Sequence, residues 1–112
     1  MEHLINQELF ETFLGLQPSE KPVPGFVVIW FSARWCGPCR RVNETMLLEQ
    51  VPEVKWYKCD VDENSYTPGF CNVKSIPAFV AIVDKKVAGS IQTSDTLQII
   101  EWVKQLLNKY SK

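Results

Sequence analysis

The sequence contains no hydrophobic run long enough to span a membrane and no large excess of charge of either sign. Its longest apolar runs are residues 26–31 and 78–83, whereas a helix that spans a bilayer needs about 18 or more apolar residues. The formal net charge is −1, so the chain as a whole gives no electrostatic support for binding nucleic acid or an acidic membrane. We therefore expect neither nucleic acid nor a membrane among its partners.

The first eight residues lack the basic and apolar segments of a secretory signal, and they lack the arginine-rich composition of a transit peptide. The simplest interpretation is a cytoplasmic protein. A length of 112 residues suits one core, so we predict a single domain over residues 1–112. Four cysteines are few for a domain that depends on disulfides, and in an intracellular chain a close pair is more often catalytic or metal-binding.

Short apolar segments alternate with amphipathic ones along the chain. The apolar segments predict strands over 26–32, 54–61, 78–83 and 87–91, with a short edge strand at 3–5. The amphipathic segments predict helices over about 7–16, 36–49 and 96–108, and a short helix or turn at 64–71. The first long strand is apolar without alternation, which is typical of a strand covered on both faces. The order of elements predicts an α/β sandwich around a central mixed sheet.

Several residues mark where these elements begin and end. Asn6 is a suitable N-cap for the first helix, and Asp95 with Gln98 resembles a capping box before the last one. Prolines at 18, 22 and 24 predict a loop over 18–25, and residues 84–86 join a hairpin without the usual turn glycine. The face of the last helix that we expect to contact the sheet consists of Leu97, Ile100, Val103, Leu106 and Leu107.

Residues 32–41 read SARWCGPCRR and hold two cysteines, Cys36 and Cys39, with two residues between them. The pair falls where a strand ends and a helix begins, which is where α/β proteins place their sites. Pro38 suits the first turn of a helix because its missing N–H would be unpaired there. Residues three apart on a helix have Cβ atoms about 5–6 Å apart, close to disulfide distance. The motif allows a redox dithiol, half of a metal site or a pair of small core side chains.

The two sulfurs would not be equivalent in a redox dithiol. Cys36 is expected at a helix N-terminus, where free N–H groups and the helix dipole stabilise a thiolate. Cys39 lies one turn further in, so we expect it to be more buried and more protonated. Cys36 would then attack a disulfide, and Cys39 would attack Cys36 and release the reduced target. Gly37 would let a substrate backbone come close.

The other two interpretations have less support. A zinc site needs four ligands, of which this pair supplies two. Cys59 and Cys71 could complete the set, but their spacing is not that of a second zinc knuckle, and His3 is remote in the sequence. A plain core pair is unusual beside Trp, Gly and Pro at a strand-to-helix turn. We therefore predict a redox dithiol and no metal.

Three motifs together resemble the thioredoxin family, and the resemblance covers nearly the whole chain. They are Trp35-Cys36-Gly37-Pro38-Cys39, the stretch 58–64 that is similar to K-x-x-V-D-x-N after the third strand, and Ile76-Pro77 before the fourth strand. The resemblance implies the thioredoxin fold, a three-layer α/β/α sandwich, and a protein-disulfide reductase of cell redox homeostasis. It also implies that no cofactor is bound and that a separate reductase, usually an NADPH-dependent flavoprotein, supplies electrons for exposed disulfides on other proteins. We expect a monomer.

The resemblance also assigns roles to residues. The proline that matches Pro77 is cis in the family and faces the active-site disulfide, and the backbone of Ile76 would pair with an extended substrate. Trp35 would form part of a docking surface. Thr93 corresponds roughly to a glycine that usually lines the substrate groove, and Lys58 matches a lysine that usually partners a buried aspartate.

The sequence departs from the family at several of these positions. Trp30 stands where the family usually carries that buried aspartate, which helps to move the proton of the inner thiol. A tryptophan cannot relay a proton as a carboxylate does, so Lys58 is left without its usual partner. Glu44 replaces a proline that usually kinks the helix, so the kink is expected to be absent. These changes predict a divergent member with a modified groove or an altered rate.

Other residues near the motif have both a functional and a structural interpretation. The cations Arg34, Arg40 and Arg41 would favour acidic partners and a Cys36 thiolate, or they are solvated surface charges. Cys71 is a candidate regulatory thiol, whereas Cys59 is better explained as a buried thiol. The remaining tryptophans are expected to be core or packing residues: Trp30, Trp56 and Trp102.

Two other functions compete with the reductase. An oxidase or isomerase of the protein disulfide isomerase type would use the same chemistry in reverse, but Gly-Pro between the cysteines and the missing signal argue against it. A partner subunit could instead use the fold as a scaffold without catalysis, which Trp30 and Thr93 leave open.

Overall fold

The computed structural model describes residues 1–19 and 22–110, and residues 20–21 of the predicted proline-rich loop lie outside this part. The elements follow one another as β1 (Glu2–His3), α1 (Gln7–Phe13), β2 (Phe26–Ser32), the 3₁₀ helix η1 (Pro38–Arg41), α2 (Glu44–Gln50), β3 (Lys55–Asp60), α3 (Tyr66–Phe70), β4 (Ala78–Val83), β5 (Lys86–Gln92) and α4 (Thr96–Tyr110). This order confirms the predicted strands and all but one of the predicted helices.

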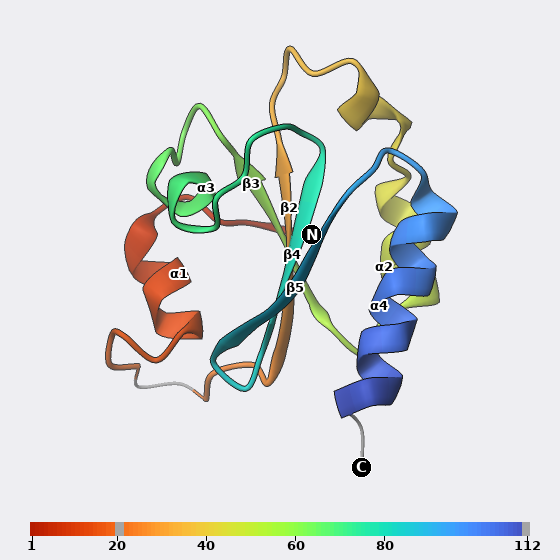
Figure 1. Ribbon diagram of the computed structural model, residues 1–112. Helices are drawn as coiled ribbons and strands as arrows, with labels where there is room; N and C mark the ends of the chain where they lie inside the picture. The colour runs from red at the N-terminus through yellow and green to blue at the C-terminus, as the bar shows by residue number, and fades with distance from the viewer. Residues whose placement is uncertain (20–21, 111–112) are drawn as a thin grey trace.

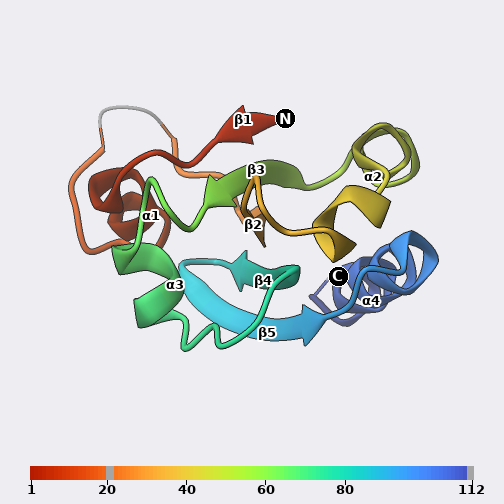
Figure 2. The same ribbon diagram turned by 90° about the horizontal axis from the view of Figure 1, so that it is seen from above.

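The five strands form one mixed sheet in the order β1-β3-β2-β4-β5. β1, β3 and β2 are parallel, whereas β4 runs antiparallel to β2 and β5 antiparallel to β4. Figures 1 and 2 show α1 and α3 on one face of the sheet and α2 and α4 on the other. The predicted α/β/α sandwich around a mixed sheet is therefore confirmed.

The central strands β2 and β4 are buried almost throughout, as their unbroken apolar runs predicted. Their side chains divide between two core clusters. The cluster under α2 and α4 contains Trp30 and Phe79, and the cluster under α1 and α3 contains Phe31 and Val80. Because successive side chains of a strand point to opposite faces, β2 and β4 supply residues to both clusters.

The helix predicted over 36–49 is interrupted, which is a correction to the sequence analysis. The chain forms the short helix η1, leaves it at Val42 with an extended backbone, and starts α2 after Asn43. The side chain of Asn43 accepts a hydrogen bond of 3.0 Å from the backbone N–H of Met46, which is the bond of an N-cap. The break is therefore present although Glu44 replaces the family's proline, because Asn43 restarts the helix.

The last helix also differs from its prediction. It extends to Tyr110, and Leu97 is 64% exposed instead of facing the sheet. Ile99, which the prediction omitted, is fully buried beside Ile100 and Val103. The helix begins after Asp95, as predicted, and the carboxylate of Asp95 accepts from two backbone N–H groups. The buried face includes Ile99 and Val103, and Leu97 lies outside it although its spacing from Ile100 fits a helix.

Two smaller predictions have mixed outcomes. Asn6 caps α1 through a 2.9 Å bond from the N–H of Leu9, as predicted. Asp95 caps α4, but Gln98 does not complete a capping box, because its side-chain oxygen accepts from the hydroxyl of Thr93 instead. Gln98 therefore ties the end of β5 to the start of α4.

Candidate functional site

Cys36 and Cys39 form a disulfide with their Cα atoms 5.3 Å apart. Cys36 lies in the turn after β2 and Cys39 lies within η1, so the pair occupies the carboxyl end of a central strand. Both side chains are 3% exposed. The expectation that Cys39 would be more buried is therefore wrong for this oxidised form, because both cysteines pack into the same buried cluster.

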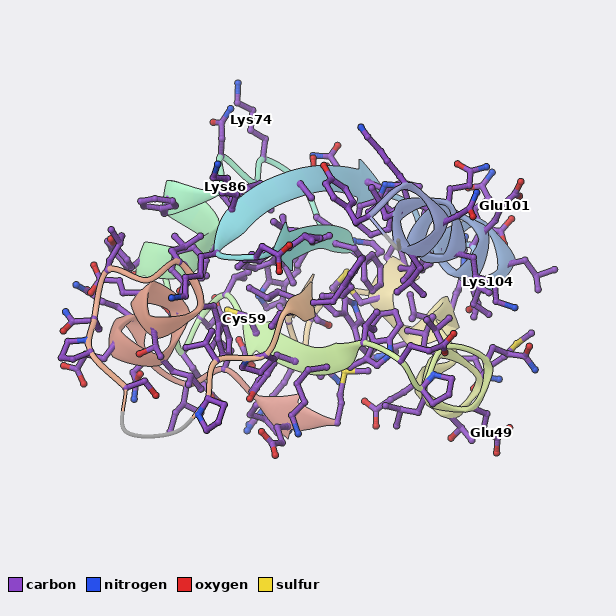
Figure 3. The ribbon with its side chains drawn as sticks, turned by 90° about the horizontal axis from the view of Figure 1, so that it is seen from below. Glu49, Cys59, Lys74, Lys86, Glu101 and Lys104 are labelled. Atoms are coloured by element: carbon purple, nitrogen blue, oxygen red, sulfur yellow. A yellow bond between two sulfur atoms is a disulfide. The ribbon has the colours of Figure 1, made fainter. Side chains whose placement is uncertain are left out.

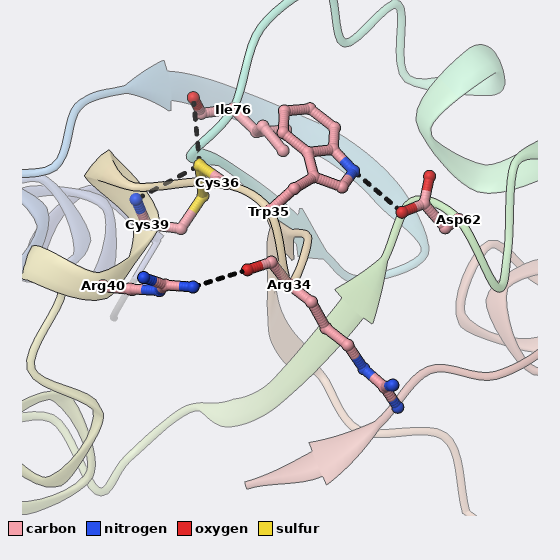
Figure 4. The surroundings of a disulfide bond; sticks show 7 residues. All are labelled: Arg34, Trp35, Cys36, Cys39, Arg40, Asp62 and Ile76. Carbon is pink, nitrogen blue, oxygen red and sulfur yellow. Dashed lines mark hydrogen bonds between the residues drawn. A yellow bond between two sulfur atoms is a disulfide. The ribbon is translucent and has the colours of Figure 1, made fainter.

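The sulfur of Cys36 has two polar neighbours (Figure 4). The backbone N–H of Cys39 donates to it at 3.2 Å, and the carbonyl oxygen of Ile76 lies 3.8 Å away. A disulfide sulfur has no proton to donate, so the second is a contact in this form and becomes a hydrogen bond only for a thiol. The N–H of Cys39 can stabilise a thiolate at Cys36 once the bond is reduced.

The segment that faces Cys36 is the predicted Ile76-Pro77 pair. The peptide bond between these residues is cis, as the resemblance implied. Ile76 is half-buried and Pro77 is buried, so the carbonyl of Ile76 is the polar group that this segment presents to the sulfur.

Trp35 lies beside the disulfide and is 68% exposed. Its indole N–H donates to a carboxylate oxygen of Asp62 at 2.9 Å, which fixes the ring (Figure 4). A hollow of about 550 Å³ opens between Trp35 and Ile76, with an apolar border that includes Pro68 and Val73. This hollow is large enough for side chains of an extended segment, and two residues of its border, Trp35 and Ile76, are neighbours of Cys36.

The side chain of Thr93 is held by hydrogen bonds, whereas the space beside Gly37 is open. Thr93 follows Gln92, which pairs with Ala78 across β4 and β5, so Thr93 lies next to Pro77 in the sheet register. Its hydroxyl accepts from the N–H of Asp95 at 3.0 Å, so the side chain is tied to the start of α4. A Cβ added at Gly37 would meet no atom within 4 Å, so the chain itself leaves this position open.

The position of the family's buried aspartate is filled by the core residue Trp30. Its ring is 3% exposed and stacks on Phe79 with the ring centroids 5.9 Å apart. The ammonium of Lys58 lies 4.4 Å from the centroid of the Trp30 ring. Lys58 thus has a partner in this chain, and that partner is an aromatic face instead of a carboxylate.

The three arginines that flank the motif, Arg34, Arg40 and Arg41, are all exposed. Arg40 donates to the backbone carbonyl of Arg34 at 3.1 Å and so closes the loop that carries Cys36 (Figure 4). No hydrogen bond drawn in Figure 4 joins the side chain of Arg34 or Arg40 to a sulfur.

The other two cysteines belong to the opposite face of the sheet. Cys59 is fully buried in the cluster under α1 and α3 (Figure 3). Cys71 is half-buried against the same cluster. Burial, with a smaller effect of the neighbouring Asp60, raises the pKa of Cys59 to about 12. Burial raises the pKa of Cys71 to about 11. The fold therefore does not bring the four cysteines together, and no group of three metal-ligating side chains occurs among residues 1–19 and 22–110.

Asp62 is a residue of the site that the sequence analysis missed. It lies in the stretch 58–64, which was noted only as part of the resemblance. In the same stretch, buried Asn64 donates to the hydroxyl of Thr67 at 2.8 Å and anchors the start of α3. An aspartate shortly after a strand end was the signal, but its partner Trp35 is 27 residues away in sequence and only the fold pairs them.

Within the part of the chain that the structure describes, no helix is long and apolar enough to cross a membrane.

Comparisons with known proteins agree with this site. A family model described as thioredoxin matches residues 5–105, a range that includes both cysteines of the disulfide. The thioredoxin of Chlamydia pneumoniae is 31% identical over 114 aligned residues, which cover 99% of this chain and 100% of that protein. Mitochondrial thioredoxin-3 of Saccharomyces cerevisiae is 35% identical over 82 residues, or 71% of this chain and 65% of the yeast protein. The X-ray structure of Fasciola hepatica thioredoxin is similar with a TM-score of 0.78 and 28% identity, covering 94% of this chain and 98% of that one.

Proposed function

This chain belongs to the thioredoxin family and has the thioredoxin fold, and on that premise we propose that Cys36 is the attacking sulfur and Cys39 the resolving one. The family activity is the exchange of a protein dithiol for a disulfide on another protein, so the chain is a protein-disulfide oxidoreductase. The observation that carries this function is the Cys36–Cys39 disulfide at the carboxyl end of β2.

The surroundings of the two sulfurs support the division of roles. Cys36 receives the N–H of Cys39, and its sulfur lies 3.8 Å from the carbonyl of Ile76. Ile76 and Trp35, the residue before Cys36, both border the hollow where a substrate segment can lie. Cys39 borders a different hollow, on the side of Trp30 and Lys58. A substrate segment in the first hollow therefore lies closer in the fold to Cys36, and Cys39 then attacks Cys36 to release the substrate.

Replacing each cysteine separately tests these roles. The reduced protein is freed of reductant and mixed with insulin as the disulfide substrate. Cys36→Ser is expected to lose reduction completely and to form no adduct. Cys39→Ser is expected to accumulate a mixed disulfide between Cys36 and the substrate, because the resolving attack is missing. Mass spectrometry of the quenched reaction detects the adduct. An adduct that forms with Cys36→Ser and not with Cys39→Ser would reverse the assignment.

The reduction potential separates the reductase from the isomerase or oxidase alternative. A value near about −270 mV is typical of reducing thioredoxins, whereas about −180 mV is typical of disulfide isomerases. We expect the lower value, measured by equilibrating the protein in dithiol buffers of known potential and counting free thiols by alkylation and mass. A value near the isomerase potential, or no reversible two-electron couple, would exclude the reductase.

Disulfide-bearing proteins are the substrates and a reductase is the donor of the family in general. For this chain we propose a separate NADPH-dependent flavoprotein as the donor and no bound cofactor. The purified protein should then show no flavin absorbance, and it should oxidise NADPH only when a flavoprotein reductase is added. NADPH oxidation by the chain alone would contradict this proposal.

We also propose that the protein is a cytoplasmic monomer. Cys59 and Cys71 are free thiols, which suits a compartment where thiols are kept reduced. A fusion of the full chain to a fluorescent protein should give a diffuse cytoplasmic signal, and sedimentation should give the mass of one chain. Accumulation in an organelle, or a dimer mass under reducing conditions, would contradict the corresponding part.

A further inference from the structure

A hollow of about 480 Å³ lies beside Cys39, on the side of the sheet that α2 and α4 cover. Its border brings together residues from three elements, namely Trp30 of β2, Lys58 of β3 and Cys39 of η1. Cys39 is 3% exposed. Solvent in this hollow therefore lies next to Cys39, a residue that is otherwise buried.

The ring of Trp30 holds Lys58 at this hollow. The two residues are direct partners in the parallel ladder of β2 and β3, so their side chains leave the same face of the sheet. The Lys58 nitrogen lies 4.4 Å from the ring centroid, within the range of a cation–π contact. Trp30 is itself fixed by its stack on Phe79. A rigid ring thus places a charge that would otherwise move freely on a flexible stem.

The other charged side chains at the border are Arg34, Arg40 and Glu44. The guanidinium of Arg40 is bonded to the carbonyl of Arg34, and the side chain of Arg34 extends away from the disulfide (Figure 4). Glu44 is the one carboxylate among the described residues of the border, and it lies 3.6 Å from the amino-terminal nitrogen of Met1. The border of this hollow therefore has an excess of positive charge. Lys58 also borders a neighbouring hollow of about 170 Å³ with the carboxylates Asp60 and Glu63, but it is the cation that the ring of Trp30 holds in place.

We propose that the ammonium of Lys58, held over Trp30, stabilises the thiolate of Cys39 and so speeds the resolving half of the exchange. This proposal rests on the function proposed above. A positive charge near a thiol favours its ionised form. A carboxylate at position 30 would have the opposite charge and would serve as a base for the proton. This chain replaces a base with a cation, and Lys58 acts through Cys39 as a positioning residue.

The step balances without a further reactant. After Cys36 has attacked a substrate disulfide, Cys39 gives its proton to water in the hollow. The Cys39 thiolate then attacks the sulfur of Cys36, the bond between Cys36 and the substrate breaks, and the electron pair leaves on the substrate sulfur, which takes a proton from water. The protein dithiol is oxidised to the Cys36–Cys39 disulfide, and the substrate disulfide is reduced to two thiols.

The test uses Lys58→Met, Lys58→Arg and, as a matched control on the same strand, Lys55→Met. The reduced full chain is mixed in a stopped-flow instrument with an aromatic disulfide whose two thiolate products absorb visible light. The first release reports attack by Cys36 and the second reports attack by Cys39. In a Cys36→Ala background, the ultraviolet absorbance of the thiolate against pH gives the fraction of Cys39 that is ionised.

Lys58→Met is expected to lower the ionised fraction of Cys39 at neutral pH about tenfold, as for a change of one pH unit in its midpoint, and to slow the second release correspondingly. The first release is expected to be unchanged. Lys58→Arg should keep the ionised fraction of Cys39 and the rate of the second release near their wild-type values, because it keeps a positive charge over the ring. Lys55→Met should alter neither quantity. Lys58 is half-buried at the edge of the hollow, so its variants should melt near the wild-type temperature.

Unchanged ionisation and an unchanged second release in Lys58→Met would overturn the proposal. A folded Lys58→Arg variant whose second release is as slow as that of Lys58→Met would also overturn the proposal, because the positive charge would then not be the cause. Wild-type protein that does not reduce protein disulfides at all would instead refute the proposed function, so the two failures are distinguishable.

Discussion

Single side chains decide how the disulfide meets a substrate, and Trp35 is the most exposed aromatic side chain beside it. A ring that is 68% exposed would adopt several rotamers in solution if nothing held it. The carboxylate of Asp62 holds the indole N–H at 2.9 Å. Asp62 therefore affects substrate docking without contacting a sulfur, because it fixes Trp35, which borders the hollow between Trp35 and Ile76.

Asp62→Ala is expected to weaken substrate docking without changing the fold. The lost bond is exposed, so its contribution is about 1 kcal/mol, which corresponds to about a fivefold rise in KM for a protein disulfide. The turnover number should change little because Cys36 and Cys39 keep their surroundings. Steady-state insulin reduction measures both constants, and Glu63→Ala, the neighbouring exposed carboxylate, is the control. An equal effect of both substitutions would exclude a specific role for the Trp35 contact.

Cys59 makes stability depend on alkaline pH. Its pKa is raised from an ordinary thiol value to about 12 by burial, so the folded protein keeps a proton that the unfolded chain loses above about pH 8.5. The free energy of unfolding should therefore be highest below that pH and fall as pH rises toward 12. The contribution of this thiol to the slope is at most about 1.4 kcal/mol per pH unit.

This expectation is checked by measuring the free energy of unfolding of the oxidised wild type and of Cys59→Ala in urea between about pH 8 and 10.5. The variant should lose stability less steeply with pH than the wild type does. Val80→Ala, a truncation in the same core cluster without a titrating group, should lower stability by the same amount at every pH. Parallel curves for wild type and Cys59→Ala would show that this thiol is not the titrating group.

At the scale of elements, sequence patterns located strands better than helix boundaries. The run at β4 is apolar at every position and the run at β2 is apolar up to Ser32, so the sequence indicated burial on both faces. The helix over 36–49 was misjudged because its apolar spacing continues across the break. The N-cap signal was present at Asn43, but an asparagine within a periodic segment competes with that periodicity, and tertiary packing decides between them. Leu97 was misplaced because it lies three residues before Ile100 and so fits the helical spacing, but packing against the sheet buries Ile99 and leaves Leu97 exposed.

The hairpin turn between β4 and β5 gives a prediction at this scale. Asp84 and Lys85 both have positive φ, 49° and 69°, as in the tight turns that usually contain glycine. Lys85→Gly removes a left-handed residue that costs about 1–2 kcal/mol and increases the entropy of the unfolded chain by less. We expect a net gain of about 0.5–1 kcal/mol in the free energy of unfolding, measured by urea denaturation. Lys86→Gly, the next residue and part of β5, should instead be destabilising, and a loss of stability in both variants would contradict the expectation.

For the whole molecule, the sheet separates the redox disulfide from one of the two core clusters. The disulfide, Trp30 and Phe79 belong to the cluster under α2 and α4, whereas Cys59 belongs to the cluster on the other face. The sequence identified the redox pair, and the resemblance matched Trp30 and Lys58 to two positions that are partners in the family. It predicted that Lys58 would lack a partner, because the contact between its ammonium and the Trp30 ring depends on the register of β2 against β3. Residues far apart in sequence become neighbours only through such pairing, which is why the environment of Cys39 required the structure.

This separation predicts that two equal truncations have unequal effects on exchange. Phe79→Leu and Phe31→Leu change the same fully buried residue type on neighbouring central strands, at positions that face opposite clusters. Both should lower the free energy of unfolding by about 1–2 kcal/mol through lost packing. Only Phe79→Leu removes the ring on which Trp30 stacks, so only this variant should slow the release of substrate by Cys39. Urea denaturation measures the free energy of unfolding, and the two-phase stopped-flow reaction measures the rate of substrate release. Equal slowing by Phe31→Leu would mean that a loss of stability is enough to slow the release, whichever cluster is truncated.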